Sequence, residues 1–309
     1  MSIESGRELQ RTLERTSLLT EALCGLPAVA TLDWADLASE AMASIGNASI
    51  AVTIICSIDG GGVIDTIEAV GVASHSDQVE SADLAGIRAR ADRLVALGFA
   101  PELDQLGQSP LIGPAERLLG GRDWRLGPLG KVMGDIQVGG LLVGVGKLGE
   151  AEKGRVLMTL IAPTRSLVHD HHVQQLGATL PLLVRRTLLA VGPVSTGTSN
   201  WLTEREQQVL DQLSLGKSVR QIADSLGRSP HTVHDHVKNL HRKLNASSRG
   251  ELIARALGHL PRGTRIRHRG ADAIEIAPKP FANQTLRLTG TEAALNEGEV
   301  ARAMNRDAV

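Results

Sequence analysis

The chain has 309 residues, 42% of them hydrophobic and 2% aromatic, and its formal net charge is −1. This length suits two domains, and the hydrophobic content is enough for packed cores, which excludes a disordered or fibrous chain. No run of eighteen apolar residues and no signal-peptide pattern occurs, so we expect a cytoplasmic protein with no membrane partner. Tyrosine is absent, which argues against recognition of single-stranded nucleic acid by base stacking.

The first part of the chain predicts a helix followed by two paired strands. Apolar residues have helical spacing over residues 17–42, with a bend at Pro27. Residues 50–58 alternate with a period of two, which predicts a strand with one face in the core. A glycine-rich turn at 59–62 then leads to a return strand at 63–72.

More helices and strands follow, and together they predict a mixed α+β domain with an antiparallel sheet. The pattern after the first two strands depends on apolar spacing and on Gly and Pro content. The elements expected there are, in order, a helix at 77–97, an irregular stretch at 101–130, strands at 135–145 and 155–161, and a helix at 163–191 kinked at Pro181.

Composition places the domain boundaries. A short polar linker at 193–200 separates the domain at 1–192 from a helical module at 201–260. Residues 261–309 start with a basic run and continue as a polar tail, for which we predict a flexible extension. The alternative is that the arginines of the basic run add phosphate contacts.

Residues 202–257 carry the start signals of four short helices. Thr203 and Glu206 fit a capping box, in which the Thr hydroxyl accepts a free N–H and the Glu side chain accepts from the N–H of the cap residue. Ser218 and Gln221 repeat this pattern. Apolar residues spaced three and four apart follow each box, so both helices should be amphipathic.

The third helix, residues 230–244, has a thin apolar face and a polar one. Gly227 provides a turn, Ser229 caps the helix, and Pro230 suits its first position, where no N–H is needed. The two faces consist of Val233, Val237, Leu240 and Leu244 on one side and His231, Asp235, Lys238 and Arg242 on the other. Two helices joined by a tight turn, the second polar on its outside, are typical of a helix-turn-helix that enters the major groove.

Charge is concentrated around these helices. From residue 201 to residue 270, Lys and Arg outnumber Asp and Glu by 13 to 6, whereas the rest of the chain has 20 against 28. A positive module attached to a negative domain suits a protein whose second part meets phosphates.

The segment resembles the LuxR-type (FixJ/NarL-type) C-terminal DNA-binding domain. The resemblance lies in L-T-x-R-E at 202–206, V-L at 209–210, G-x-S at 216–218, I-A-x-x-L at 222–226, T-V-x-x-H-x-x-x-L-x-x-K-L at 232–244 and S-R-x-E-L at 248–252. Asn245-Ala246 stands where the family usually has a Gly-Val pair, and His234-Asp235 where a more basic pair is often seen. The element order of residues 1–192 is also similar to that of GAF- or PAS-like sensor domains, in which a pocket lies between sheet and helices.

The LuxR-type resemblance implies which side chains meet DNA. The positions where relatives read base edges are His234, Asp235 and Lys238, with Asn239 as a neighbour. The candidates for phosphate contacts are Thr232, His231, Arg242, Lys217 and Arg228. Structural roles fall to Thr203, Glu206, His236, Lys243 and Arg249, with an ion pair expected among Arg205, Glu206 and Arg249 and with His236 half-buried against the second helix.

Three other motifs have plainer interpretations. Gly144–Gly149 fits G-x-G-x-x-G, but an acidic turn and an apolar strand follow it, which favours a hairpin over a nucleotide site. His169, His171 and His172 could suggest a metal, as could His231, His234 and His236; side chains one or two apart on a helix do not converge, so we predict no metal site. Cys24 and Cys56 should be buried free thiols rather than a disulfide.

A phosphorylation receiver is the alternative for the first domain that the resemblance raises. It would need an acidic pair near its start and an Asp, a Ser or Thr, and a Lys at strand ends. Asp33 and Asp36 are not adjacent, and the supporting set after Asp59 is missing. We therefore favour a sensor-like domain.

The sequence thus predicts a transcriptional regulator without cofactor or enzymatic activity. We expect it to bind double-stranded DNA as a homodimer, with a first domain that senses a signal or dimerises; a small-molecule ligand and RNA polymerase are further partners that this interpretation allows. The rival interpretation is a ligand-binding or protein-interaction protein whose helix-turn-helix makes protein contacts. No nucleophile with a base and no recognisable pair of carboxylates points to an enzyme.

Overall fold

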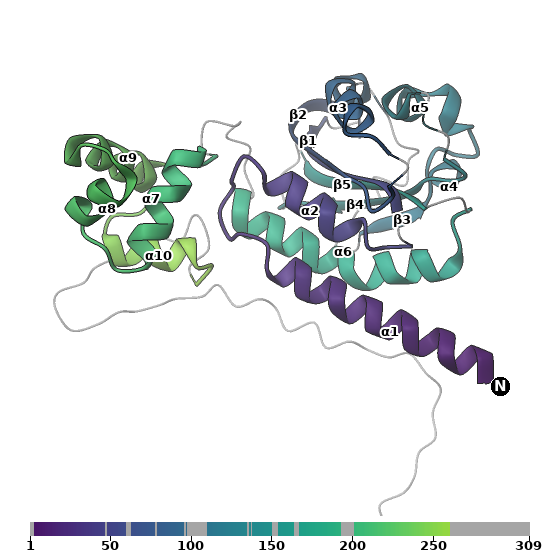
Figure 1. The fold of residues 1–309 in the computed structure, drawn as a ribbon. Coiled ribbons are helices and arrows are strands. Elements are labelled where there is room, and N and C mark those ends of the chain that lie inside the picture. Colours follow the sequence, from purple (N-terminus) through teal and green to yellow (C-terminus); the bar gives the residue numbers. More distant parts are fainter. Residues whose placement is uncertain are drawn as a thin grey trace, which may run out of the picture. The chain divides into compact units, whose positions relative to one another are not determined.

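The fold is taken from a computed structural model (Figure 1). Met1–Thr264 form one compact unit. The structure describes residues 3–259 except for 47, 60–62, 78, 96, 98–109, 135, 137, 150–153, 164–166 and 193–200. The predicted linker at 193–200 and the predicted tail at 261–309 therefore lie outside the described residues.

Five antiparallel strands form a single sheet in the order β2-β1-β5-β4-β3. Their bounds are β1 Ala48–Ile58, β2 Ile64–Ala73, β3 Leu111–Pro114, β4 Leu142–Lys147 and β5 Arg155–Pro163. The central strands β1 and β5 pair along most of their length, from Ala48 opposite Pro163 to Ser57 opposite Arg155. The predicted antiparallel sheet with helices is confirmed.

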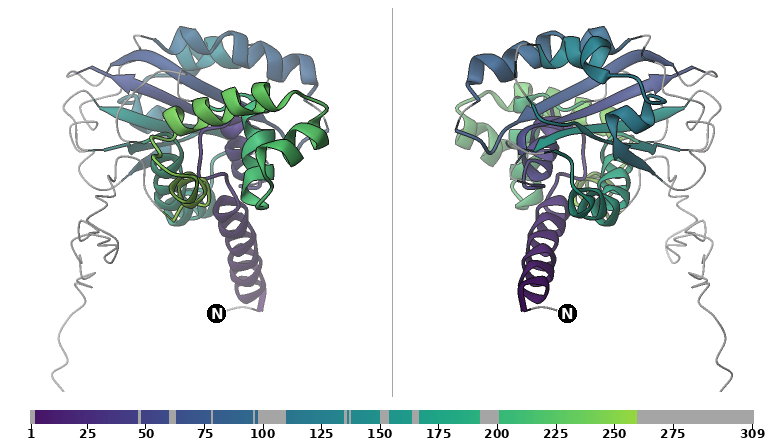
Figure 2. Two further views of the ribbon diagram at one scale, coloured as in Figure 1. Left: turned by 90° about the vertical axis from the view of Figure 1, so that its left-hand side faces the viewer. Right: turned by 90° about the vertical axis from the view of Figure 1, so that its right-hand side faces the viewer.

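Helices cover both faces of this sheet (Figures 1 and 2). One layer consists of α1 Ile3–Cys24, α2 Trp34–Met42 and α6 Asp170–Val191. The other consists of α3 Ser81–Ala89, η1 Ala91–Leu94, α4 Ala115–Leu118, η3 Trp124–Leu126 and α5 Pro128–Met133. Because both faces are covered, β1 buries Ile55 as completely as Ile54, so the expectation of a strand with one face in the core was wrong.

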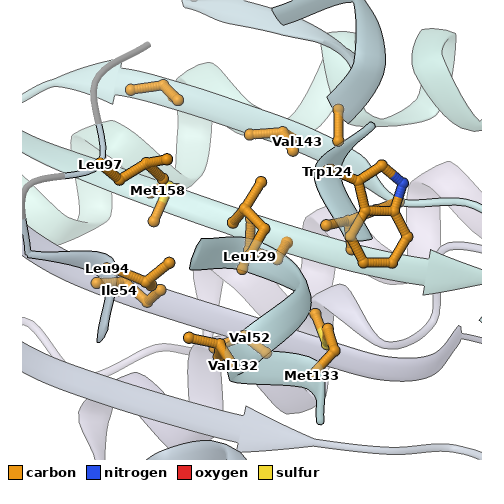
Figure 3. Packing of buried hydrophobic residues seen from close by; sticks show 14 of the residues in the cluster. Val52, Ile54, Leu94, Leu97, Trp124, Leu129, Val132, Met133, Val143 and Met158 are labelled. Carbon is orange, nitrogen blue, oxygen red and sulfur yellow. The ribbon is translucent and has the colours of Figure 1, made fainter. Parts of the chain in front are cut away.

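The core beneath α3 and α5 is a large cluster of apolar side chains. Figure 3 shows Val132 of α5 close to Val52 of β1, and the ring of Trp124 at the edge of the same cluster. Trp124 is 1% exposed and Val132 is fully buried. Burying one such aliphatic or aromatic side chain is worth about 1.5–3 kcal/mol, so this layer is a main source of stability.

On the opposite face, small residues let two helices approach the sheet. Gly71, Thr53, Thr159 and Gly144 form one row across β2, β1, β5 and β4. A Cβ atom on Gly71 would lie 1.9 Å from the carbonyl carbon of Ala35 in α2. The backbone of α2 therefore touches the sheet at a point where only glycine fits.

The helical module has the four helices that the start signals predict: α7 Glu204–Ser214, α8 Val219–Leu226, α9 Pro230–Lys243 and α10 Arg249–Ala256. Its core includes one side chain from the first part of the chain, Val29, which is 3% exposed. Next to it, the N–H of Leu202 donates to the carbonyl oxygen of Ala30 at 2.7 Å. Trp201, by contrast, packs with the core residues of α1, α2 and α6.

Several element bounds differ from those predicted. The first helix begins at Ile3 rather than near residue 17, and a non-helical segment separates α1 from α2. This segment is held by the Trp34 Nε1–H, which donates to the carbonyl oxygen of Pro27 at 2.9 Å. The helix expected at 77–97 is split into the short α3 and η1.

The second half of the first domain also departs from the sequence pattern. β3 lies inside the stretch expected to be irregular. The closing helix α6 begins at Asp170 rather than at Pro163, which is the last residue of β5. Pro181 lies inside α6, as expected. The G-x-G-x-x-G motif lies on β4 and in the turn to β5, with the Leu148 N–H donating to the Arg155 carbonyl at 2.7 Å, so the hairpin interpretation is confirmed.

None of the helices in the described part of the chain combines the length and the apolar character needed to cross a bilayer.

Candidate DNA interface on the helical module

The turn between α8 and α9 has the geometry of a helix-turn-helix. Gly227 ends α8 in the left-handed conformation, with φ of 62°. The hydroxyl of Ser229 then accepts a hydrogen bond from the Thr232 N–H at 3.1 Å, and Pro230 occupies the first turn of α9. Local sequence therefore determines where α9 starts.

α9 buries one side and exposes the other. Val233, Leu240 and Leu244 are fully buried, and Val237 is partly buried. The side chains that the structure leaves exposed on this helix include His231, Thr232, His234, Asp235, Lys238, Asn239 and Arg242. All four candidates for base reading thus lie on the exposed surface of one helix.

The exposed charges of the module are mainly positive. Residues 201–259 contain nine Lys and Arg against six Asp and Glu. Two of the acids, Glu206 and Glu251, form buried ion pairs with Lys243 and Arg255. The remaining charges stay at the surface, where they can act on a polyanion.

Glu206 lies at the centre of the contact between α7 and α9. Its Oε2 accepts from Lys243 Nζ at 2.6 Å and from the Thr203 N–H at 2.8 Å, and the predicted capping box is present. The side chains of Glu206 and Lys243 are 4% and 9% exposed. Burial alone would raise the pKa of the Glu206 carboxyl, but the hydrogen bonds from Lys243 and Thr203 hold that pKa below its usual range.

The ion pair expected among Arg205, Glu206 and Arg249 is absent from the described contacts. Arg249 instead donates through Nη2 to the carbonyl oxygens of Leu213 at 3.1 Å and Lys217 at 2.8 Å. It therefore satisfies the Leu213 carbonyl in the last turn of α7 and the Lys217 carbonyl shortly before α8.

Sequence reasoning missed the second buried pair. Glu251 Oε1 accepts from Arg255 Nη2 at 2.7 Å, and its Oε2 accepts from the Ser247 N–H at 2.8 Å. The i, i+4 spacing was a signal that could have revealed it. Although burial opposes ionisation, the hydrogen bonds from Ser247 and Arg255 lower the pKa of Glu251 to about 2.

This pair predicts that the module loses stability in acid. The pKa of Glu251 is below its usual 4.5 in the folded chain, so its contribution is complete above pH 4.5 and is lost as the pH falls towards 2. Glu251→Gln should cost about 1–3 kcal/mol at pH 7, and this difference should shrink in acid. Urea unfolding of both proteins from pH 7 to pH 3 measures it, with the exposed Glu204→Gln as control. A pH-independent difference would contradict the assignment.

The left-handed conformation of Asn245 explains one departure from the family pattern. Asn245 has φ of 51°, and it is the non-glycine residue with positive φ in the described part of the chain. Asn tolerates this region better than most residues, so it replaces the usual glycine after α9 at small cost. The Ala246 N–H donates to the His241 carbonyl at 2.9 Å and closes the turn.

The remaining candidates have mixed surroundings. Arg228 is exposed in the α8–α9 turn, whereas Lys217 is half-buried and its Nζ donates to Gln212 Oε1. His236 is half-buried and lines a hollow together with Leu226 of α8, which fits its expected packing against the second helix.

The expectation that neighbouring histidines of the 169–172 group do not converge was wrong. His171 and His172 converge in the first turn of α6, with ring centroids 4.0 Å apart, and His169 is the N-cap residue of this helix. Burial lowers the pKa of His172 to about 4, with further contributions from His171, His169 and Arg15. Within the described residues, no group of His, Cys, Asp and Glu is arranged to hold a metal.

The expectation that both cysteines are buried was wrong for Cys24. Both are free, but Cys24 is exposed while Cys56 is buried. Cys24 follows Leu23, which is buried in the core together with Leu19, and Cys24 itself lies on the exposed side of α1. Burial raises the pKa of the Cys56 thiol to about 12.

Four helices with a capped, exposed and mainly positive third helix define a helix-turn-helix module. Comparison with known families identifies it further: residues 200–256 match the family "Bacterial regulatory proteins, luxR family". These residues are therefore a LuxR-family helix-turn-helix domain.

Similar proteins share this module. The transcriptional regulatory protein UhpA of Escherichia coli (strain K12) is 45% identical over 62 residues, which cover 20% of this chain and 32% of UhpA. The nitrate/nitrite response regulator protein NarP of the same strain is 54% identical over 48 residues, covering 16% of this chain and 22% of NarP. The chain thus spans a third or less of the length of these relatives.

Solved structures can be aligned with more of the chain, but at low sequence identity and with low TM-scores. A structure described as SdiA in complex with octanoyl-rac-glycerol covers 84% of this chain and 96% of its own, at 14% identity and a TM-score of 0.29. A complex of the Vibrio cholera VqmA with ligand and DNA covers 40% of this chain and 51% of its own, at 22% identity and a TM-score of 0.19.

Proposed function

We propose that this chain is a DNA-binding transcriptional regulator that places α9 in the major groove. The observation that carries the proposal is the exposed face of α9, where His234, Asp235, Lys238 and Asn239 stand clear of the module's core. Side chains of these types hydrogen-bond base edges, and the positive surface around them attracts phosphates. The LuxR-family match over the same helices and the regulator relatives support it.

We propose further that the protein acts as a homodimer on two half-sites and that its α+β domain senses a signal or dimerises. Two copies of a short recognition helix read a longer site than one, which is how helix-turn-helix proteins reach useful specificity. A small-molecule ligand for the first domain and RNA polymerase are the partners this proposal adds to duplex DNA.

A salt titration of DNA binding tests the central proposal. The full chain is used, because Val29 of the first domain belongs to the core of the module. Binding to genomic duplex fragments should fall steeply with log salt, and selection from random duplexes should yield a preferred sequence with two related halves. Binding no tighter than that of an acidic control protein at low salt would refute it and favour the protein-contact alternative.

Lys238→Ala should weaken specific binding without affecting folding. Lys238 is exposed on α9, so its loss should cost about 1–3 kcal/mol of binding to the preferred sequence and relax the preference at one base. Fluorescence anisotropy on the preferred and altered duplexes measures this. Lys131→Ala, an exposed lysine on α5, is the control. An equal loss on all sequences would reassign Lys238 to a phosphate.

A further inference from the structure

A hollow of about 230 Å³ lies where α7, α8 and α9 meet. Its floor is apolar. Its rim carries Arg205 and Gln208 of α7, Arg228 of the α8–α9 turn, and Thr232 and His236 of α9. One arginine from a helix and one from a turn therefore border the same depression, although they are 23 residues apart in the sequence.

The charges around the hollow favour an anion. None of the residues that line it is acidic. Arg205 is oriented by its own helix, because its Nη1 donates to Gln208 Oε1 at 2.8 Å. The neighbouring carboxylate of Glu204 accepts from Gln208 Nε2 at 3.2 Å. Within the described contacts neither arginine has an ion pair, so their remaining N–H groups are available to a ligand with several oxygens.

The position of the hollow suggests which anion it takes. Thr232 and His236 lie on the same helix as Asp235 and Lys238, on the flank that faces α7. A helix in a major groove about 12 Å wide has a phosphate backbone along each side. Side chains on its flank and on the adjoining helix therefore meet phosphates while its outer face meets bases.

We propose that the hollow binds one backbone phosphate of the DNA and that Arg205 is a positioning residue for α9. This inference rests on the proposed DNA-binding function and adds a contact from α7, where the sequence indicated only a structural role. Arg205 and Arg228 hold the phosphate oxygens from two sides, and the N-terminus of α9 adds a favourable dipole. The phosphate contact fixes how far α9 enters the groove and carries no sequence information.

The test compares salt dependence in the full chain. Arg205→Ala should lower affinity about 3–10-fold on every duplex alike and reduce the slope of log K against log salt by about 1, while the ratio of specific to non-specific binding stays constant. Arg205→Lys should restore the slope and part of the affinity, because it keeps the charge but not the forked geometry. Arg117→Ala, an exposed arginine on α4, is the matched control.

Each other outcome overturns the inference. The first is an unchanged salt slope for Arg205→Ala, and the second is a loss of DNA affinity confined to one sequence. The third is a loss of DNA affinity that accompanies a lowered melting temperature and that Arg205→Lys does not restore. If the hollow binds free phosphate instead, inorganic phosphate at constant ionic strength should raise the melting temperature of the wild type but not that of Arg205→Ala. The DNA affinity of Arg205→Ala would then equal that of the wild type. If the wild type binds no DNA, the proposed function itself fails, which is a separate result.

Discussion

Replacing Arg155 by methionine should cost about 3–5 kcal/mol in the free energy of unfolding. Arg155 of β5 and Glu68 of β2 form an ion pair whose side chains are 3% and 4% exposed. Nη1 of Arg155 also donates to the carbonyl oxygens of Val191 at 3.1 Å and Gly192 at 2.7 Å, at the end of α6. Methionine fills similar space but leaves a buried carboxylate and two helix-end carbonyls without this donor. Chemical denaturation of the full chain measures the loss.

Two further variants separate the causes of that loss. Arg88→Met removes an arginine that is 47% exposed from its pair with Asp36, and it should cost less than about 1 kcal/mol. Combining Arg155→Met with Glu68→Leu removes the stranded charge and should recover much of the loss, because a buried pair is often replaceable by apolar residues. If the double variant is no more stable than Arg155→Met, the cost arises at the α6 carbonyls. Faster amide exchange in the last turn of α6 would accompany that result.

Replacing Lys243 by methionine should destabilise the helical module by about 3–5 kcal/mol at pH 7. The substitution leaves the buried Glu206 carboxylate without the ammonium that α9 supplies. In the wild type the pKa of Glu206 is below its usual range, so this stability is present at neutral pH and is lost in acid. In the variant, burial raises the pKa of the Glu206 carboxyl, and its protonation in acid then removes the unpaired buried charge. The difference from wild type should therefore shrink as the pH falls, which amide exchange in α7–α10 can follow.

Lys238→Ala is the matched control for that experiment, since it removes a lysine from the same helix at an exposed position. It should lower DNA affinity and leave amide exchange in the module unchanged, whereas Lys243→Met should speed exchange throughout α7–α10. Equal exchange in the two variants would show that the Glu206–Lys243 pair contributes little to stability. The two lysine variants thus separate an effect on DNA binding from an effect on the stability of the module.

Local chemistry made most of the helical module predictable. The capping boxes at Thr203 and Ser218 and the turn at Gly227 act over three or four residues, so each signal and its structural consequence lie within one turn of helix. The partners of the buried charges did not follow in the same way. Arg249 was expected to pair with Glu206, and the choice of Lys243 instead depends on how α7 and α9 cross, which no local pattern encodes.

The first domain was predictable in its strands and less so in its helices. Strict alternation marked β1, but the number of its covered faces depended on how α2 and the distant α6 pack on the sheet. β3 was missed because four residues within a Gly- and Pro-rich stretch have too little pattern of their own and become a strand only by pairing with β4.

The sequence by itself determined the order of the helices in the module, the start of each of them and the exposed polar face of α9. These features depend on interactions between residues three or four apart or on the periodic burial of one face. Only the tertiary structure decided that Gly71 must be a glycine, that Arg155 joins two strands to the end of α6, and that Arg205 and Arg228 border one hollow. Each of these three contacts brings together residues that are far apart in the chain. Such contacts depend on how whole helices and strands pack and not on local preference.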